Sequence, residues 1–203
     1  MKVKEIEVNK NLIIIGGGIP GICAALQAAR LGVEVALVHD EVFFGGNISP
    51  IKNVGMSGAM KGNDYNFFSR EGGIIEEIHL RNLYSNPTNN PYRRDALFWD
   101  LFTKEDKLEV YIETYIDEVE TDENKNILAV SGTQRGAEIR YNFKGNLFLD
   151  NTGDGTIGYL AGADYRVGRE SKKEFQEKLA PENEDNKCLP STLSWYAEDT
   201  GRT

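Results

Sequence analysis

Three glycines near the N-terminus have the spacing of a turn that could hold phosphate groups: Gly16, Gly18 and Gly21. The first would let the chain turn tightly out of a strand, the second would let backbone approach a pyrophosphate, and the third would let a helix pack closely on the strand. The N-terminus of such a helix offers unpaired N–H groups and a positive dipole end to an anion. The intervening residues belong to the same candidate site: Gly17, Ile19 and Pro20.

The elements needed to position these glycines follow in the required order. Residues 11–15 form an apolar run suited to a buried strand, and residues 22–31 form a helical stretch that ends at Gly32. A second apolar strand follows at residues 33–38. The motif alone could be a surface turn, because the chain contains 21 glycines. The order of strand, turn, helix and strand favours a dinucleotide-binding βαβ unit.

A side chain at the end of the second strand is expected to bind ribose hydroxyls. Asp40 stands just past that end and is preceded by His39. A neutral imidazole can also bond a hydroxyl, though less strongly than a carboxylate. Adjacent strand residues point in opposite directions, and either residue could take the role.

Composition limits the class of protein. The chain has 203 residues, 40% of them hydrophobic, and a net charge of −9. This balance is typical of a globular protein and argues against nucleic acid or an anionic membrane as a partner. Cys23 and Cys188 lie far apart and form no metal-binding pair. The N-terminus lacks an apolar signal core, and we expect a cytoplasmic location. The oligomeric state is left open.

The rest of the chain predicts an α/β fold, a doubly wound parallel sheet with an inserted antiparallel β-meander. Two helical stretches, residues 71–84 and 91–104, precede a period-two pattern at about 108–144 that we interpret as the meander. Residues 146–149 then form an apolar run typical of a buried parallel strand. A second glycine-bearing turn follows that strand: Thr152, Gly153, Asp154 and Gly155.

The pattern predicts two domains, residues 1–165 and 166–203. Residues 41–69 are loop-rich, and a loop of that length is usually functional or mobile. Residues 171–187 are strongly polar and indicate a solvated face or linker. Apolar residues return only near the end, at Leu189, Leu193, Trp195 and Tyr196. We expect this last part to be the start of a truncated second domain.

Several segments follow one another in a distinctive order: residues 16–21, 45–47, 70–77, 150–155, 161–163 and 168–170. Together they resemble the FAD-dependent oxidoreductases of the glutathione-reductase-like class. The closest resemblance is to a bacterial family in which some members carry a xanthan lyase label. It extends over about residues 12–202.

The resemblance implies FAD as the cofactor. It implies that Gly16, Gly18 and Gly21 hold the pyrophosphate, and that Gly45, Gly46 and Asn47 run beside the pyrophosphate and ribityl chain. Ile116 would touch adenine through its backbone, and residues 152–155 would close over the dinucleotide. Family members commonly have Glu where this chain has His39. They also continue beyond this point into a substrate domain and a C-terminal segment that contacts the flavin.

Three hypotheses for function remain. The first is an FAD-dependent oxidoreductase acting on an unknown small organic substrate, present here as an incomplete N-terminal portion. The second is a catalytically silent dinucleotide-binding fragment, and the third is an NAD(P)-binding module. The sequence names no catalytic base: His79 lies on an amphipathic helix, and Arg169 with Glu170 suits a pair that fixes a loop. No base-and-acid arrangement for a lyase is evident.

Overall fold

The computed structural model describes residues 3–56, 71–191 and 199–201. Contacts divide the chain into two compact units, a first unit at Met1–Ala163 and a second unit at Asp164–Thr203. Parts of three predicted features fall outside the described residues. They are residues 57–69 of the expected loop, Arg70 of the family-like segment, and the apolar residues Leu193, Trp195 and Tyr196.

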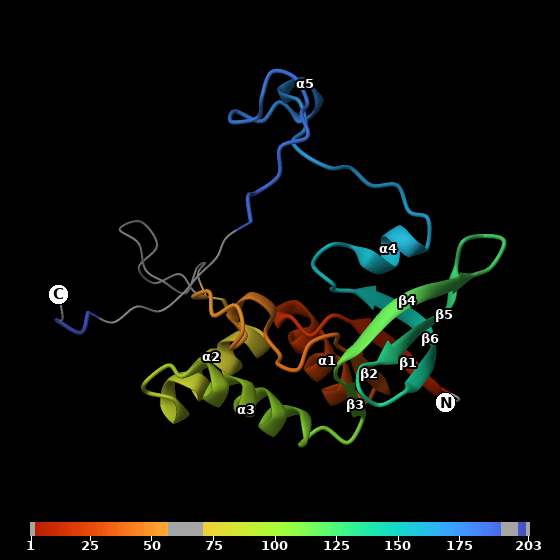
Figure 1. The fold of residues 1–203 in the computed structure, drawn as a ribbon, viewed down its shortest axis with the longest axis vertical. Coiled ribbons are helices and arrows are strands. Elements are labelled where there is room, and N and C mark those ends of the chain that lie inside the picture. Colours follow the sequence, from red (N-terminus) through yellow and green to blue (C-terminus); the bar gives the residue numbers. More distant parts are fainter. Residues whose placement is uncertain (1–2, 57–70, 192–198, 202–203) are drawn as a thin grey trace. The chain divides into compact units, whose positions relative to one another are not determined.

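The first unit alternates strands and helices around one sheet (Figure 1). Its elements are β1 (Lys4–Ile15), α1 (Ile19–Arg30), β2 (Val35–Val38), the short 3-10 helix η1 (Gly46–Ile48), α2 (Gly73–Ser85), α3 (Pro91–Phe102), β3 (Leu108–Tyr111), β4 (Thr114–Thr121), β5 (Ile127–Gln134), β6 (Ile139–Asp150) and α4 (Thr156–Leu160).

The sheet has six strands in the order β3-β2-β1-β6-β5-β4. Strands β3, β2, β1 and β6 are parallel, while β5 runs antiparallel to both β6 and β4. The predicted α/β class, with a parallel core and an antiparallel meander, is confirmed. The chain leaves β1 for β2 on one side, and β1 also pairs with β6 on the other. The boundary between β1 and β6 is therefore the topological switch point of the sheet.

Two details of the prediction were wrong. We placed residues 108–113 in the meander, but β3 pairs in parallel with β2, from Val35↔Leu108 to Val38↔Tyr111. We also separated residues 138–144 from 146–149, but they form the single strand β6. Its polar first half pairs with β5 and with the polar first half of β1, which starts at Lys4. Backbone pairing sustains both strands where one face meets water, so the apolar pattern missed these halves.

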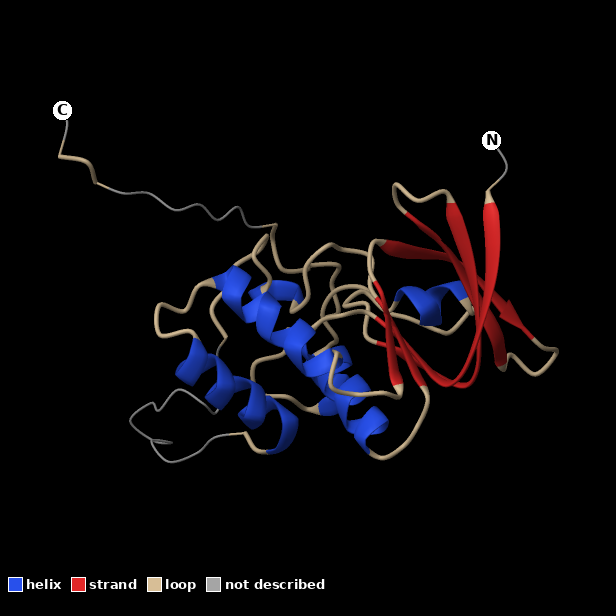
Figure 2. Ribbon diagram, turned by 90° about the horizontal axis from the view of Figure 1, so that it is seen from below, coloured by secondary structure: helices blue, strands red, loops and turns tan. Residues whose placement is uncertain are grey.

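Two apolar clusters hold the sheet from opposite faces. On one face, Ile14 and Leu37 pack with Leu26 of α1 and Phe98 of α3. Figure 2 shows helices α1–α3 gathered on this side. Burial of each such side chain stabilises the fold by about 1.5–3 kcal/mol.

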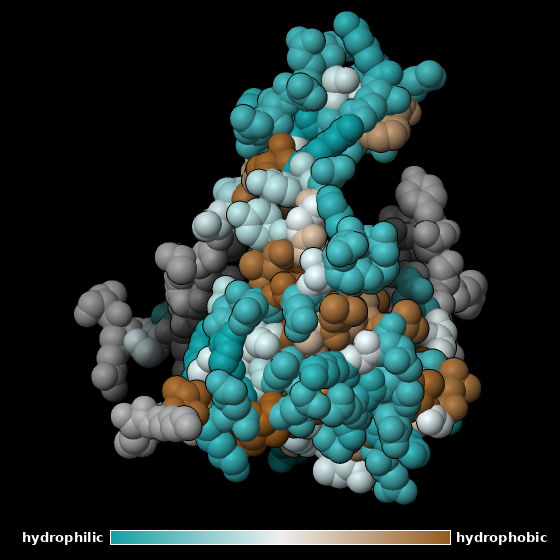
Figure 3. Space-filling view, turned by 90° about the vertical axis from the view of Figure 1, so that its right-hand side faces the viewer, coloured by the Kyte–Doolittle hydropathy of each residue, from teal (hydrophilic) through white to brown (hydrophobic). Residues whose placement is uncertain are grey.

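The opposite face is covered differently from the helical layer that a doubly wound sheet predicts. Ile13 and Ile15 pack there with Ile116 of β4, Phe143 of β6 and Ile157 of α4. Residues of β4 can reach β1 only because the sheet curves, so the meander and α4 form this layer. Figure 3 faces the side of β4–β6 and shows a mainly hydrophilic surface with scattered apolar spots. The first unit therefore buries its apolar residues between the sheet and its two covers.

The second unit has little buried surface. It contains α5 (Lys172–Phe175), and none of its described residues is buried. Arg169 and Asp185 exchange backbone hydrogen bonds of 2.9 and 3.1 Å, and their side chains also pair. The predicted Arg169–Glu170 pair is therefore wrong: Glu170 lies 3.9 Å from Arg166 instead. Residues 171–187 include this helix and part of the bridge, so they are more ordered than the linker we expected.

Among the residues that the structure describes, no helix combines the length and apolar character needed to cross a bilayer.

Candidate functional site

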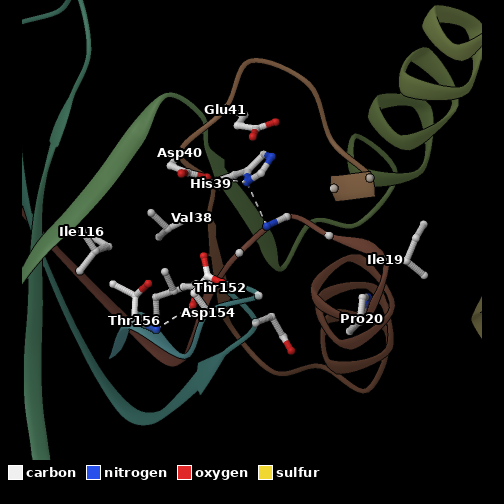
Figure 4. A pocket seen from close by; sticks show the side chains of 18 of the residues that line it. Ile19, Pro20, Val38, His39, Asp40, Glu41, Ile116, Thr152, Asp154 and Thr156 are labelled. Carbon is white, nitrogen blue, oxygen red and sulfur yellow. Dashed lines mark hydrogen bonds and ion pairs between the residues drawn. The ribbon is translucent and has the colours of Figure 1, made fainter. Parts of the chain in front are cut away.

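A pocket of about 650 Å³ lies at the carboxyl ends of β1, β2 and β6 (Figure 4). Its volume falls in the range of small-molecule sites, about 300–1,000 Å³, and its position is where open α/β sheets bind ligands. Most of the predicted site residues line it: Gly16, Gly17, Gly18, Ile19, Pro20, His39, Asp40, Gly45, Gly46, Asn47, Ile116, Thr152, Gly153 and Asp154. Gly21 and Gly155 do not line it.

The three glycines of the first turn serve different purposes. Gly16 has a φ of +107°, and an added Cβ would lie 2.1 Å from the backbone oxygen of Asn151. A Cβ on Gly21 would lie 1.9 Å from the backbone oxygen of Gly16. A Cβ on Gly18 would meet only Pro20, at 3.7 Å. Gly16 and Gly21 are therefore required by packing, whereas the missing side chain of Gly18 leaves open space at the pocket.

Helix α1 begins at this open space. Gly18 is its N-cap and provides no side-chain capping bond, and the first turn contains no acidic residue. Its first N–H groups and the positive dipole end are thus left for an anionic ligand. Figure 4 shows Ile19 and Pro20 at this helix start, on one side of the pocket.

A second glycine turn packs backbone to backbone against the first. The N–H of Gly45 donates to the oxygen of Gly17 at 2.8 Å, and Gly18 and Gly45 form a parallel bridge. Gly45 and Gly46 both have positive φ, +102° and +59°, and a Cβ on Gly46 would lie 3.3 Å from the Cα of Gly18. Glycine at these positions therefore permits both the turn and the close approach.

Helix α3 holds the loop that carries this second turn. A side-chain oxygen of Asp95 accepts the Phe44 N–H at 2.8 Å, and Arg94 donates to the Ile48 oxygen at 2.7 Å. Both side chains are buried. Burial raises the pKa of Asp95, against the lowering effects of the Phe44 bond and nearby His39.

Our sequence reasoning missed Arg94 and Asp95. The signal was present, because both lie at helical spacing from the apolar residues Phe98, Leu101 and Phe102. Charged residues on the buried side of a helix need specific partners.

His39 connects the two turns. Its Nδ1 accepts the N–H of Gly17 at 3.1 Å, and its Nε2 lies 2.9 Å from the backbone oxygen of Phe43. A backbone N–H only donates and a carbonyl only accepts, so these bonds assign a neutral ring with its proton on Nε2. Both ring nitrogens are thus used within the protein. Asp40, whose side chain is 51% exposed, is the better placed of the two residues for a ligand hydroxyl.

A third turn follows β6. The carboxylate of Asp150 accepts hydrogen bonds from the Thr152 N–H and hydroxyl, at 3.0 and 2.7 Å. It also accepts the N–H groups of Ile157 and Gly158, at 2.8 and 3.0 Å. Burial would raise the pKa of Asp150, but these hydrogen bonds outweigh it and hold the pKa below its usual value. Asp150 thereby fixes Thr152–Asp154 at the pocket and occupies the N-terminus of α4.

The end of the pocket farthest from α1 is apolar below and charged above. Figure 4 shows Val38 and Ile116 on the same side of the pocket, with Asp40 and Glu41 beyond the strand end. Lys52 also lines the pocket and lies 3.3 Å from Glu41. We did not single out Glu41 or Lys52 from the sequence, since only the folded loop brings them to the pocket.

The remaining candidates lie elsewhere. His79 is on α2, outside the pocket lining. Cys23 is half-buried on α1, and burial raises the pKa of its thiol. Within residues 3–56, 71–191 and 199–201, no group of three or more His, Cys, Asp or Glu could hold a metal ion.

Comparison with known families identifies the chain. Residues 11–200 match the family described as FAD dependent oxidoreductase, and the chain belongs to this family. The match spans both units of the structure.

A curated relative is similar over a short stretch. It is an iron-sulfur protein of the CoB–CoM heterodisulfide reductase of Methanopyrus kandleri, 52% identical over 46 residues. The similarity covers 23% of this chain and 7% of that protein.

Two solved structures have a similar fold. A geranylgeranyl bacteriochlorophyll reductase-like protein from Thermoplasma acidophilum has a TM-score of 0.55 at 15% identity, with 78% of this chain and 43% of that one covered. An adenosine-5-phosphosulfate reductase in complex with sulfite has a TM-score of 0.50 at 18% identity, with 74% of this chain and 31% of that one covered. The chain therefore spans less than half of each of these proteins.

Proposed function

We propose that the pocket binds FAD, with the pyrophosphate at the first glycine turn and the adenosine end between β2 and β4. The observation that carries this proposal is the space at Gly18, which a single Cβ would fill. It faces the uncapped start of α1 and the backbone of the second glycine turn. The residues present thus fit a diphosphate bridge, because backbone N–H groups and a helix dipole are what such a group requires.

The charges around the pocket support a division of roles along the ligand. Asp40 and Glu41 stand near the strand end, where carboxylates suit hydroxyl donors of a ribose. Val38 and Ile116 offer an apolar surface for a flat base. Asn47 and residues 152–154 would then lie along the remaining length of the cofactor.

We propose further that the parent protein is an oxidoreductase and that these 203 residues form its cofactor-binding portion. Bound FAD would accept or donate electrons, while the protein would orient it and tune its surroundings. The partial coverage of similar reductases supports this proposal. A small organic substrate is favoured over nucleic acid by the net charge of −9. Membership of the bacterial subgroup belongs to the same proposal.

A catalytically silent dinucleotide-binding fragment is the second candidate. No described pocket residue combines a base and an acid in a hydrogen-bonded pair of the kind that nucleophilic catalysis needs. We expect the purified chain to be largely colourless and to bind FAD or ADP more weakly than a complete flavoprotein would, because contacts to the flavin ring contribute to affinity.

A thermal-shift titration of the purified chain tests the proposed cofactor. FAD and ADP should raise the unfolding temperature more than NAD, and NADP least, since its extra phosphate would meet Asp40 and Glu41. A ligand that binds at 100 times its dissociation constant stabilises the native state by about 2.7 kcal/mol. A larger shift with NAD than with FAD would contradict the proposal and favour an NAD(P)-binding module.

A further inference from the structure

His39 stands where the resemblance led us to expect a ribose ligand, yet both of its ring nitrogens are occupied inside the protein. We propose that His39 is a positioning residue that holds the phosphate-binding turn only while its ring is neutral. Cofactor affinity then falls as the pH drops. This inference rests on the proposed function, because it concerns the same pocket.

The geometry makes His39 the connection between two turns. Its Nδ1 bonds the N–H of Gly17, in the first turn, and its Nε2–H bonds the Phe43 oxygen, just before the second. The ring is 5% exposed and stacks on Phe44 with centroids 5.1 Å apart. A Cβ on Gly17 would lie 2.7 Å from the ring. The imidazole therefore determines where the backbone at residue 17 lies.

Carboxylates face this ring from two elements. Asp40 Oδ1 lies 3.4 Å from Nδ1, in the same segment. Asp95 comes from α3, and its charge interacts with His39. Glu41 and Lys52 form an ion pair farther along the loop. The backbone of β3 contributes the oxygen of Tyr111, which accepts the His39 N–H at 2.8 Å.

Protonation would reverse the role of Nδ1. A second ring proton turns this atom from acceptor to donor, and it would then face the N–H of Gly17, which can only donate. The nearest acceptor for the new proton is Asp40 Oδ1. The ring would exchange its bond to Gly17 for one to Asp40. The turn would lose its support and Asp40 would lose a lone pair that could otherwise accept a ribose hydroxyl.

FAD affinity measured by calorimetry at pH 7.5 and pH 5.5, at constant ionic strength, tests the proposal on the full chain. This interval includes the range in which imidazole ordinarily gains a proton. Loss of one hydrogen bond corresponds to about a tenfold weaker affinity, and we expect a decrease of that size at pH 5.5.

Two variants separate His39 from other titrating groups. The side-chain oxygen of His39→Asn can take the place of Nδ1 and accept the Gly17 N–H, but it does not titrate. This variant should bind FAD at pH 7.5 within about threefold of the wild type and lose almost none of that affinity at pH 5.5. His39→Leu has no acceptor and should bind weakly at both values. Equal pH dependence in the wild type and His39→Asn would overturn the proposal, because Asp40, Glu41 or Asp95 would then carry it.

A measurement without cofactor distinguishes failure of this inference from failure of the proposed function. Nitrogen-15 NMR should show His39 as a neutral ring protonated on Nε2, and the Gly17 amide should shift as that ring titrates. The chain has two histidines, so His79→Gln assigns the signals. A proton on Nδ1 at pH 7.5 would overturn the positioning role. If the NMR result holds but FAD binds at neither pH, the proposed function fails and with it the coupling to affinity.

Discussion

At the scale of the residue, glycines in one motif answer to different forces. Gly16 and Gly21 are required because backbone atoms occupy the place of their side chains. Gly18 instead leaves room on the side where the proposed ligand lies. The motif is therefore part packing and part binding, and substitution can separate the two.

Gly18→Ala should fold normally and bind FAD poorly. The added methyl group meets no protein atom closer than 3.7 Å, so we expect stability to change by less than about 1 kcal/mol. It would occupy the proposed pyrophosphate position, and affinity should fall at least about tenfold, a cost of about 1.4 kcal/mol. Calorimetric titration and chemical denaturation measure the two quantities. Unchanged affinity would place the pyrophosphate elsewhere.

Gly21→Ala is the matched control. Its Cβ would lie 1.9 Å from the Gly16 oxygen, so helix and turn must separate. We expect about 1–3 kcal/mol of lost stability, which is typical of overpacking.

At the scale of the element, each of the three turns is held by a side chain from outside the motif. His39 supports the first turn, α3 supports the second through Asp95 and Arg94, and Asp150 supports the third. Because Asp150 already accepts the first N–H groups of α4, the N-terminus of α4 is satisfied within the protein. The start of α1 is the helix end that remains for the ligand.

Asp150→Asn should destabilise the first unit in a pH-dependent way. The folded state holds the pKa of Asp150 below its usual value, so its contribution to stability is complete above the unfolded pKa, about 3.9, and is lost as the pH falls through the folded pKa. At pH 7 the variant should lose about 1.5–3 kcal/mol, typical of hydrogen bonds to a charged group. Below about pH 4 the difference from the wild type should shrink.

Urea denaturation from pH 3 to pH 7 measures this difference. Asp154→Asn is a suitable comparison, since Asp154 is an exposed carboxylate in the same turn. A constant difference across the pH range would show that the charge of Asp150 is not what stabilises α4.

At the scale of the whole molecule, the two units differ in how they are stabilised. Both apolar clusters consist of residues from the first unit, and the last of them is Ile157. None of the described residues of the second unit is buried. The first unit therefore contains the apolar core and the candidate site, and its stability should not depend on residues after Ala163.

A chain that ends at Ala163 should unfold cooperatively, with a midpoint within about 4 °C of the full chain, the shift that roughly 1 kcal/mol produces. Circular dichroism during heating checks this. A chain that ends at Asp150, which lacks α4 and Ile157, should be clearly less stable because it exposes part of the core. Loss of cooperative unfolding in the longer variant would show that the second unit supports the first.

The sequence by itself determined the βαβ unit, the glycine turn and the order of the turns that face the pocket, because strand period, glycine spacing and helix signals are local. It could not determine that β3 joins the parallel strands or that β6 is continuous, since pairing joins residues far apart in the chain. Only the tertiary structure gave His39 to Gly17 and Phe43 and left Asp40 at the pocket. The hydrogen-bond partners of a side chain are set by which segments fold beside it, and local sequence does not contain that information.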